Sequence, residues 1–97
     1  MSGGLIDRPE RSRFELALPG GQIAFMDYRR RSDGVLLLTH AEVPESLRGG
    51  GIGARLTGAV LELLRERGEH IVPVCPYVIA YLQRHSAYAG LLDSAQR

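Results

Sequence analysis

The sequence contains no lysine and only one cysteine, Cys75. All twelve basic residues are therefore arginines, and the chain offers no lysine of its own as a target for modification. A single cysteine excludes a disulfide bond within the chain and fits a reducing compartment. No metal site is predicted, because the three histidines and Cys75 lack the spacing of metal ligands.

Long apolar runs and an excess of charge are also missing. No apolar stretch approaches the ~20 residues needed to cross a bilayer, and the N-terminus lacks the basic-then-apolar pattern of a signal peptide. The net charge of +1 argues against a nucleic-acid-binding protein, which is usually strongly basic. We therefore expect a cytoplasmic protein with no membrane or nucleic-acid partner. It should form a single domain, residues 1–97, with residues 1–12 as a flexible arm.

The first half of the chain is predicted to form three strands. Residues 13–18 alternate apolar and polar side chains, which is typical of a half-buried strand. The Pro-Gly-Gly turn at 19–21 separates them from a second strand at 22–29. A third strand is predicted at 35–43, after a turn at 32–34. Its continuous apolar start indicates burial on both faces and a central place in the sheet.

The second half predicts a helix, a short strand and another helix. In residues 52–67 apolar side chains recur at helical spacing, and Gly68 follows where a left-handed C-terminal cap belongs. Residues 71–75 form a short fourth strand, and Pro76 suits the first turn of a helix that ends near residues 85–86. A helix between two strands implies a parallel, right-handed crossover. The predicted fold class is α/β (α+β): a mixed, mainly antiparallel sheet of about four strands, with a β-α-β crossover and a C-terminal helix.

Four glycines lie at the junction of the third strand and the first long helix: Gly49, Gly50, Gly51 and Gly53. The start of a helix exposes unpaired backbone N–H groups, and the helix dipole favours an anion there. Glycine lacks a Cβ atom, so a ligand can approach such a backbone closely. This junction is therefore predicted to bind a phosphate or diphosphate. The alternative is that the glycines only make a tight turn and allow close helix packing.

Two common phosphate-binding loops do not fit this junction. A P-loop ends in Gly-Lys-Ser/Thr, and the chain has no lysine. The dinucleotide-binding fingerprint needs a small third residue. If Gly51 and Gly53 are its first two glycines, Leu56 stands in that place, and no acidic residue follows about twenty positions on. What remains is an arginine followed by glycines, the run RGGGIG at residues 48–53.

The run at residues 48–53 resembles the diphosphate-binding loop of the GNAT superfamily of N-acetyltransferases, written Arg/Gln-x-x-Gly-x-Gly/Ala. The preceding HAEVP at 40–44 and the following CPYV at 75–78 resemble a minimal group of single-domain GNAT-like proteins. Three ring-bearing residues of that pattern follow: Tyr81, His85 and Tyr88. The resemblance covers about residues 14–92. It implies a minimal GNAT-like fold and an acetyl-CoA-dependent N-acetyltransferase.

The resemblance also implies which residues contact acetyl-CoA. Backbone N–H groups of the loop and the Arg48 side chain would hold the diphosphate, and N–H groups near Ala41 and Val43 would orient the thioester. Arg84 is a candidate for a cofactor phosphate. Tyr77, Tyr81 and Tyr88 are candidates for packing along the cofactor or protonating the leaving thiolate, and the alternative for each is packing in the core or at its rim. The candidate cofactor-binding residues are Ala41, Val43, Arg48, Gly49, Gly50, Gly51, Ile52, Gly53, Ala54, Tyr81 and Arg84.

His40 and Glu42 are candidate catalytic bases. If no bulge interrupts the third strand, they share one face with Leu36 and Leu38, where the strand reaches the glycine loop. An imidazole and a carboxylate can both accept the proton that an amine loses during acyl transfer. The alternatives are a hydrogen-bonded core histidine and a carboxylate at a surface strand end.

Cys75 is the third candidate catalytic residue. It stands directly before a predicted helix start, whose positive end favours a thiolate. The resemblance implies that the two parallel strands diverge, that the pantetheine arm enters the gap, and that His40, Glu42 and Cys75 line it. An acetyl-Cys75 intermediate is then an alternative to direct attack by the amine. The simpler interpretation is that Cys75 is a small buried hydrophobic residue.

The acceptor side departs from the resemblance. Larger GNAT enzymes carry two helices where this chain has only the turn at 19–21. We therefore expect an open, shallow acceptor side, which favours an exposed amine of a protein or peptide as the acceptor. The alternative function is a non-catalytic acyl-CoA-binding sensor or interaction module. A third interpretation is an unrelated small α/β domain that binds no CoA.

Overall fold

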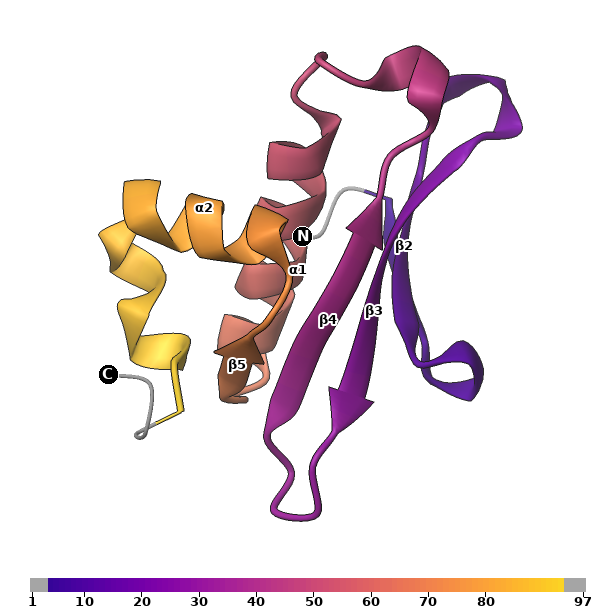
Figure 1. Ribbon diagram of the computed structural model, residues 1–97. Helices are drawn as coiled ribbons and strands as arrows, with labels where there is room; N and C mark the ends of the chain where they lie inside the picture. The colour runs from indigo at the N-terminus through magenta and orange to yellow at the C-terminus, as the bar shows by residue number, and fades with distance from the viewer. Residues whose placement is uncertain (1–3, 94–97) are drawn as a thin grey trace.

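Five strands form one sheet in the order β1-β2-β3-β4-β5 in the computed structural model, which describes residues 4–93 (Figure 1). All neighbouring strands are antiparallel except β4 and β5, which are parallel. The prediction of a mixed, mainly antiparallel sheet is confirmed, with one strand more than expected. The strands are Leu5–Arg8 (β1), Arg13–Ala17 (β2), Ile23–Arg30 (β3), Leu36–Glu42 (β4) and Ile71–Pro73 (β5).

The additional strand, β1, lies within the segment that was expected to be a flexible arm. Of that segment, residues 1–3 fall outside the described residues. The expectation is wrong for Leu5–Arg8, which pairs with β2, and for the 3₁₀ turn Pro9–Arg11. Asp7 helps to hold this segment in place, because its carboxylate accepts hydrogen bonds from the Tyr28 hydroxyl at 2.8 Å and from Arg67 at 2.8 Å. These partners are remote in sequence, so the local pattern could not reveal the strand.

Two helices complete the fold, α1 (Ile52–Glu66) and α2 (Pro76–Arg84), and both lie on one side of the sheet (Figure 1). Gly68 ends α1 with a φ of 68°, in the left-handed conformation that the sequence predicted. Pro76 occupies the first turn of α2, also as predicted. The helices cover a core of fully buried side chains: Phe14, Leu16, Met26, Leu36, Leu38, Leu56, Val60, Leu61, Leu64 and Val78.

The ladder between β4 and β5 is short. It ends at the pair Leu38 and Pro73, after which the N–H groups of Val74 and Cys75 both donate to the Leu38 carbonyl, at 3.0 and 2.8 Å. The chain then turns into α2, while β4 continues to Glu42. The two strands therefore separate beyond Leu38, beside the loop that leads to α1.

Candidate active site

A bulge in β4 decides where the candidate bases lie. His40 is opposite Asp27 and Leu38 is opposite Tyr28, so Thr39 is an additional residue in the ladder between β3 and β4. Side chains on either side of a bulge no longer alternate in step. Leu36 and Leu38 are fully buried beneath the helices, whereas His40 and Glu42 are exposed on the other face. The expectation that these four share one face is wrong because of this bulge.

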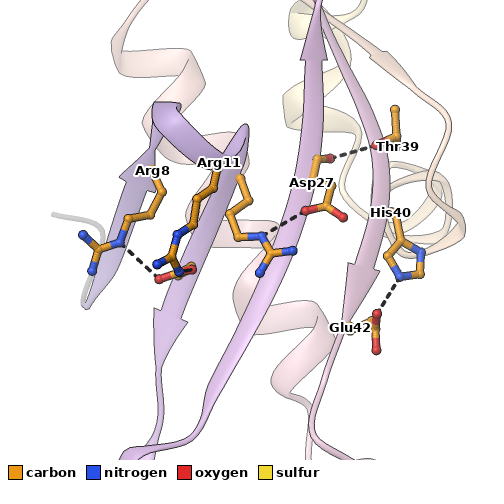
Figure 2. Close-up of polar contacts among 8 residues, drawn as sticks. Arg8, Arg11, Asp27, Thr39, His40 and Glu42 are labelled. Carbon is orange, nitrogen blue, oxygen red and sulfur yellow. Dashed lines mark hydrogen bonds and ion pairs between the residues drawn. The ribbon is translucent and has the colours of Figure 1, made fainter.

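His40 and Glu42 lie together on the helix-free face of the sheet (Figure 2). The His40 Nε2 atom is 3.0 Å from the Glu42 Oε2 atom. The two side chains are 57% and 53% exposed, so a protein surface could reach both. Phe25, which is opposite Glu42 on β3, places its ring centroid 6.3 Å from that of His40. Either residue of this pair can accept a proton, and the other is close enough to bond to it; both are open to solvent.

The loop before α1 has the conformation that the glycines permit. Gly49 and Gly51 have φ angles of 85° and 81°, which residues with a Cβ atom rarely adopt. Gly51 is the N-cap of α1, and no side chain caps this helix start. Arg48 donates from Nε to the Val43 carbonyl at 3.2 Å, which ties the loop to the end of β4. An uncapped helix start beside an arginine is suited to an anion.

This loop forms one wall of a pocket of about 360 Å³, and α2 forms the other. All the candidate cofactor-binding residues line this pocket except Ala41 and Gly50. Ala41 is buried in β4, and Gly50 lies in the loop. Tyr77, which was predicted to pack along the cofactor or to protonate the leaving thiolate, also lines the pocket. Three further lining residues were not predicted from the sequence: Leu47, Ala80 and His85. Ala80 and His85 could have been found from helical spacing, since Ala80 follows Tyr77 by three positions and His85 follows Tyr81 by four.

Two glycines of α1 allow the tyrosines of α2 to approach closely. A Cβ atom on Gly53 would be 2.5 Å from a ring carbon of Tyr77, and one on Gly58 would be 2.7 Å from the Tyr81 hydroxyl. Gly53 thus serves helix packing, as the alternative interpretation proposed for the glycines. Gly49 and Gly51 serve the loop conformation instead.

Aromatic residues continue from the pocket towards the C-terminus. The rings of Tyr81 and His85 stack, with centroids 4.0 Å apart and 26° between the planes. Tyr88 lies next to Tyr81 and donates its hydroxyl to Glu62 of α1 at 2.9 Å. This hydrogen bond raises the pKa of Tyr88. Hydrogen bonds from Arg65 first, and then from Tyr88, lower the pKa of Glu62. The cluster fixes α2 against α1.

Cys75 is the N-cap of α2 and is 1% exposed. It belongs to the hydrophobic core and does not line the pocket. The three candidate catalytic residues therefore lie apart: Cys75 is in the core beneath the helices, and the pair of His40 and Glu42 is on the opposite face of β4. A pocket beside a glycine-rich helix start, and two parallel strands that separate next to it, agree with the class of N-acetyltransferases that residues 48–53 resemble.

Comparison with known proteins agrees with this class. A sequence model for GCN5-related N-acetyl-transferases matches residues 13–91. The chain therefore belongs to the GCN5-related N-acetyltransferase family and is an N-acetyltransferase, as the sequence predicted. The fold is similar to the NMR solution structure of a GCN5-like candidate N-acetyltransferase from Staphylococcus aureus, with a TM-score of 0.67 and 23% sequence identity. That comparison covers 96% of this chain and 91% of the other. Within residues 4–93, no helix has the length and apolar character to cross a membrane.

Proposed function

We propose that the protein is an acetyl-CoA-dependent N-acetyltransferase that modifies an exposed amine of a protein or peptide. The observation that carries this proposal is the pocket between α1 and α2, which combines an uncapped helix start with the side chains of Arg48 and Arg84. Two arginines and backbone N–H groups suit the diphosphate and the further phosphate of CoA. Acetyl-CoA is also the acetyl donor typical of the family.

Each part of the site has a defined task in this proposal. Backbone N–H groups at residues 51–54 and the Arg48 guanidinium bind the diphosphate. N–H groups of β4 near Ala41 and Val43 orient the thioester where β4 and β5 separate, and stabilise charge on its oxygen. Acetyl-CoA supplies the activated acetyl group. The amine forms a bond to the acetyl carbon, His40 or Glu42 accepts the proton that the amine loses, and the C–S bond breaks so that CoA leaves as a thiolate that takes up a proton.

The helix-free face of the sheet is the proposed acceptor side. His40 and Glu42 are both more than half exposed there, and the turn Pro19–Gly21 adds no helix over them. A small amine would find few enclosing groups, whereas an amine on a larger molecule can be placed by contacts around it. This favours an exposed protein or peptide amine as the acceptor.

Cofactor binding can be tested with Arg48→Gln, which keeps a polar side chain but removes the charge. We expect CoA binding to weaken by about ten- to a hundred-fold, because a hydrogen bond to a charged group contributes about 1.5–3 kcal/mol. Pantetheine, which lacks every phosphate, should bind equally to both proteins. Isothermal titration calorimetry measures both ligands.

Arg55→Gln is the matched control, because Arg55 is an exposed residue of α1 that does not line the pocket. Thermal unfolding of each variant verifies the fold, since Arg48 also bonds to the Val43 carbonyl. The proposal fails if wild-type protein does not bind CoA, or if Arg48→Gln and Arg55→Gln bind it equally.

A non-catalytic acyl-CoA-binding module is the second candidate function. Two observations favour it. Cys75 is buried and so is not available as a nucleophile, and His40 and Glu42 lie on an open face that does not enclose an acceptor. Thiol release from acetyl-CoA in the presence of a lysine-containing peptide separates the two functions. An enzyme releases thiol in proportion to acetylated peptide, whereas a binding module binds CoA and releases none.

A further inference from the structure

Thr39 occupies a special place in β4. It is the one described residue of the strand that the ladder with β3 passes over, between the pairs His40–Asp27 and Leu38–Tyr28. Its hydroxyl donates a hydrogen bond to the backbone carbonyl of Asp27 at 3.2 Å (Figure 2). The bond therefore joins the two strands at the position where their register shifts.

The bulge has a large effect on the later residues of β4. Side chains alternate with period two, so a one-residue change of register moves every later side chain to the other face. If Thr39 were paired and the side chains alternated regularly through it, His40 and Glu42 would be on the side of Leu36 and Leu38, beneath the helices. Ala41, which is now 8% exposed, would be on the helix-free face. Whatever holds the bulge thus holds the imidazole and the carboxylate in their place.

The opposite side of this bond is well fixed. The Asp27 carboxylate accepts a hydrogen bond from Arg13 at 3.1 Å, and the Arg13 guanidinium lies 3.8 Å from the centre of the Phe25 ring. Phe25 is in turn beside His40. Asp27 therefore offers Thr39 a rigid acceptor, and β3 contacts His40 through both Asp27 and Phe25.

We propose that Thr39 is a positioning residue for acetyl transfer. Its hydroxyl holds the bulge and so aims the pair of His40 and Glu42 at the acceptor amine. The proposal rests on the proposed function of that pair. Thr39 itself takes no part in proton transfer, and it contacts neither acetyl-CoA nor the amine.

The test compares Thr39→Val with Thr39→Ser. Valine keeps the branched shape that suits a strand but removes the donor, while serine keeps the donor and loses only a methyl group. With acetyl-CoA and a lysine-containing peptide, we expect Thr39→Val to lower kcat by about three- to ten-fold, with KM for acetyl-CoA unchanged. Thr39→Ser should restore most of kcat. If Thr39→Val does not fold, Thr39→Ala provides the same comparison.

A second readout does not depend on activity. In proton NMR spectra, the His40 ring should show contacts to the Phe25 ring in wild-type protein and in Thr39→Ser. We expect these contacts to weaken in Thr39→Val. Unchanged contacts in Thr39→Val, or an unchanged kcat in an active enzyme, would overturn this inference alone. A wild-type protein that binds CoA but acetylates no peptide overturns the proposed function, and with it the catalytic meaning of the bulge.

Discussion

Cys75 and the pair of His40 and Glu42 offer two different chemistries, and their surroundings differ accordingly. The thiol of Cys75 can form an acetyl intermediate only if the acetyl group of acetyl-CoA can reach the sulfur atom. The Cys75 side chain is 1% exposed and packed within the core, whereas the pair is open to solvent. Direct attack by an amine, with the pair as proton acceptor, needs no opening of the core. At the level of single residues, the direct route is therefore favoured.

Cys75→Ala tests this preference. We expect the variant to keep most of its acetyl-transfer activity and to lose about 1 kcal/mol of stability, because a small buried side chain is shortened. Mass spectrometry of wild-type protein after exposure to acetyl-CoA should show no acetylated Cys75. An inactive but folded Cys75→Ala protein, together with an acetylated thiol, would establish the covalent route instead.

The contact between α1 and α2 shapes the proposed cofactor pocket at the scale of elements. Both helices contribute lining residues, and the Tyr77 ring lies directly against Gly53 in the first turn of α1. The pocket thus depends on a glycine whose main-chain angles are ordinary and whose missing Cβ atom is what matters. This role differs from that of Gly51, which is required for its positive φ.

A double-mutant cycle isolates this contact. Gly53→Ala should destabilise the protein by about 1–3 kcal/mol, because the new methyl group would overlap the Tyr77 ring. In a Tyr77→Ala background the same change should be neutral or stabilise the helix by up to about 1 kcal/mol. Urea unfolding of the four proteins measures the coupling. An equal effect of Gly53→Ala in both backgrounds would show that the two helices do not meet at this glycine.

The whole molecule is held together at one edge by Asp7, which joins three elements. Its carboxylate in β1 accepts hydrogen bonds from Tyr28 of β3 and from Arg67 at the end of α1. Burial first, and then the hydrogen bond to Asp7, raise the pKa of Tyr28 from 10.0 to about 12. The folded protein therefore favours the protonated phenol of Tyr28, and the free energy of unfolding should depend on pH in the range where this phenol loses its proton.

The sign of this dependence follows from the direction of the shift. Below about pH 10 the phenol is protonated in both the folded and the unfolded chain, and its full contribution is present. Between about pH 10 and 12 the unfolded chain loses the proton first, so the free energy of unfolding should fall. Tyr28→Phe should show a shallower fall over this range in urea unfolding. Parallel curves for the two proteins would contradict the assignment.

The sequence by itself determined the features that depend on near neighbours. Three features are local patterns: the glycines behind Arg48, the helix predicted at residues 52–67 with Gly68 after it, and Pro76 at the next helix start. They sufficed for the sheet type, the crossover and the family. That the residues around the glycine loop lie next to one another could be predicted for the same reason: a strand, a loop and a helix that follow one another must meet at a corner.

Only the tertiary structure decided which face His40 and Glu42 occupy. A bulge is a property of two paired strands, and the bond from Thr39 to Asp27 joins residues twelve positions apart. The same holds for Asp7 of β1, whose carboxylate is bonded by the distant residues Tyr28 and Arg67, and for Tyr77, whose contact with Gly53 arises from packing between helices. Side-chain periodicity within one segment contains no information about a register set by another.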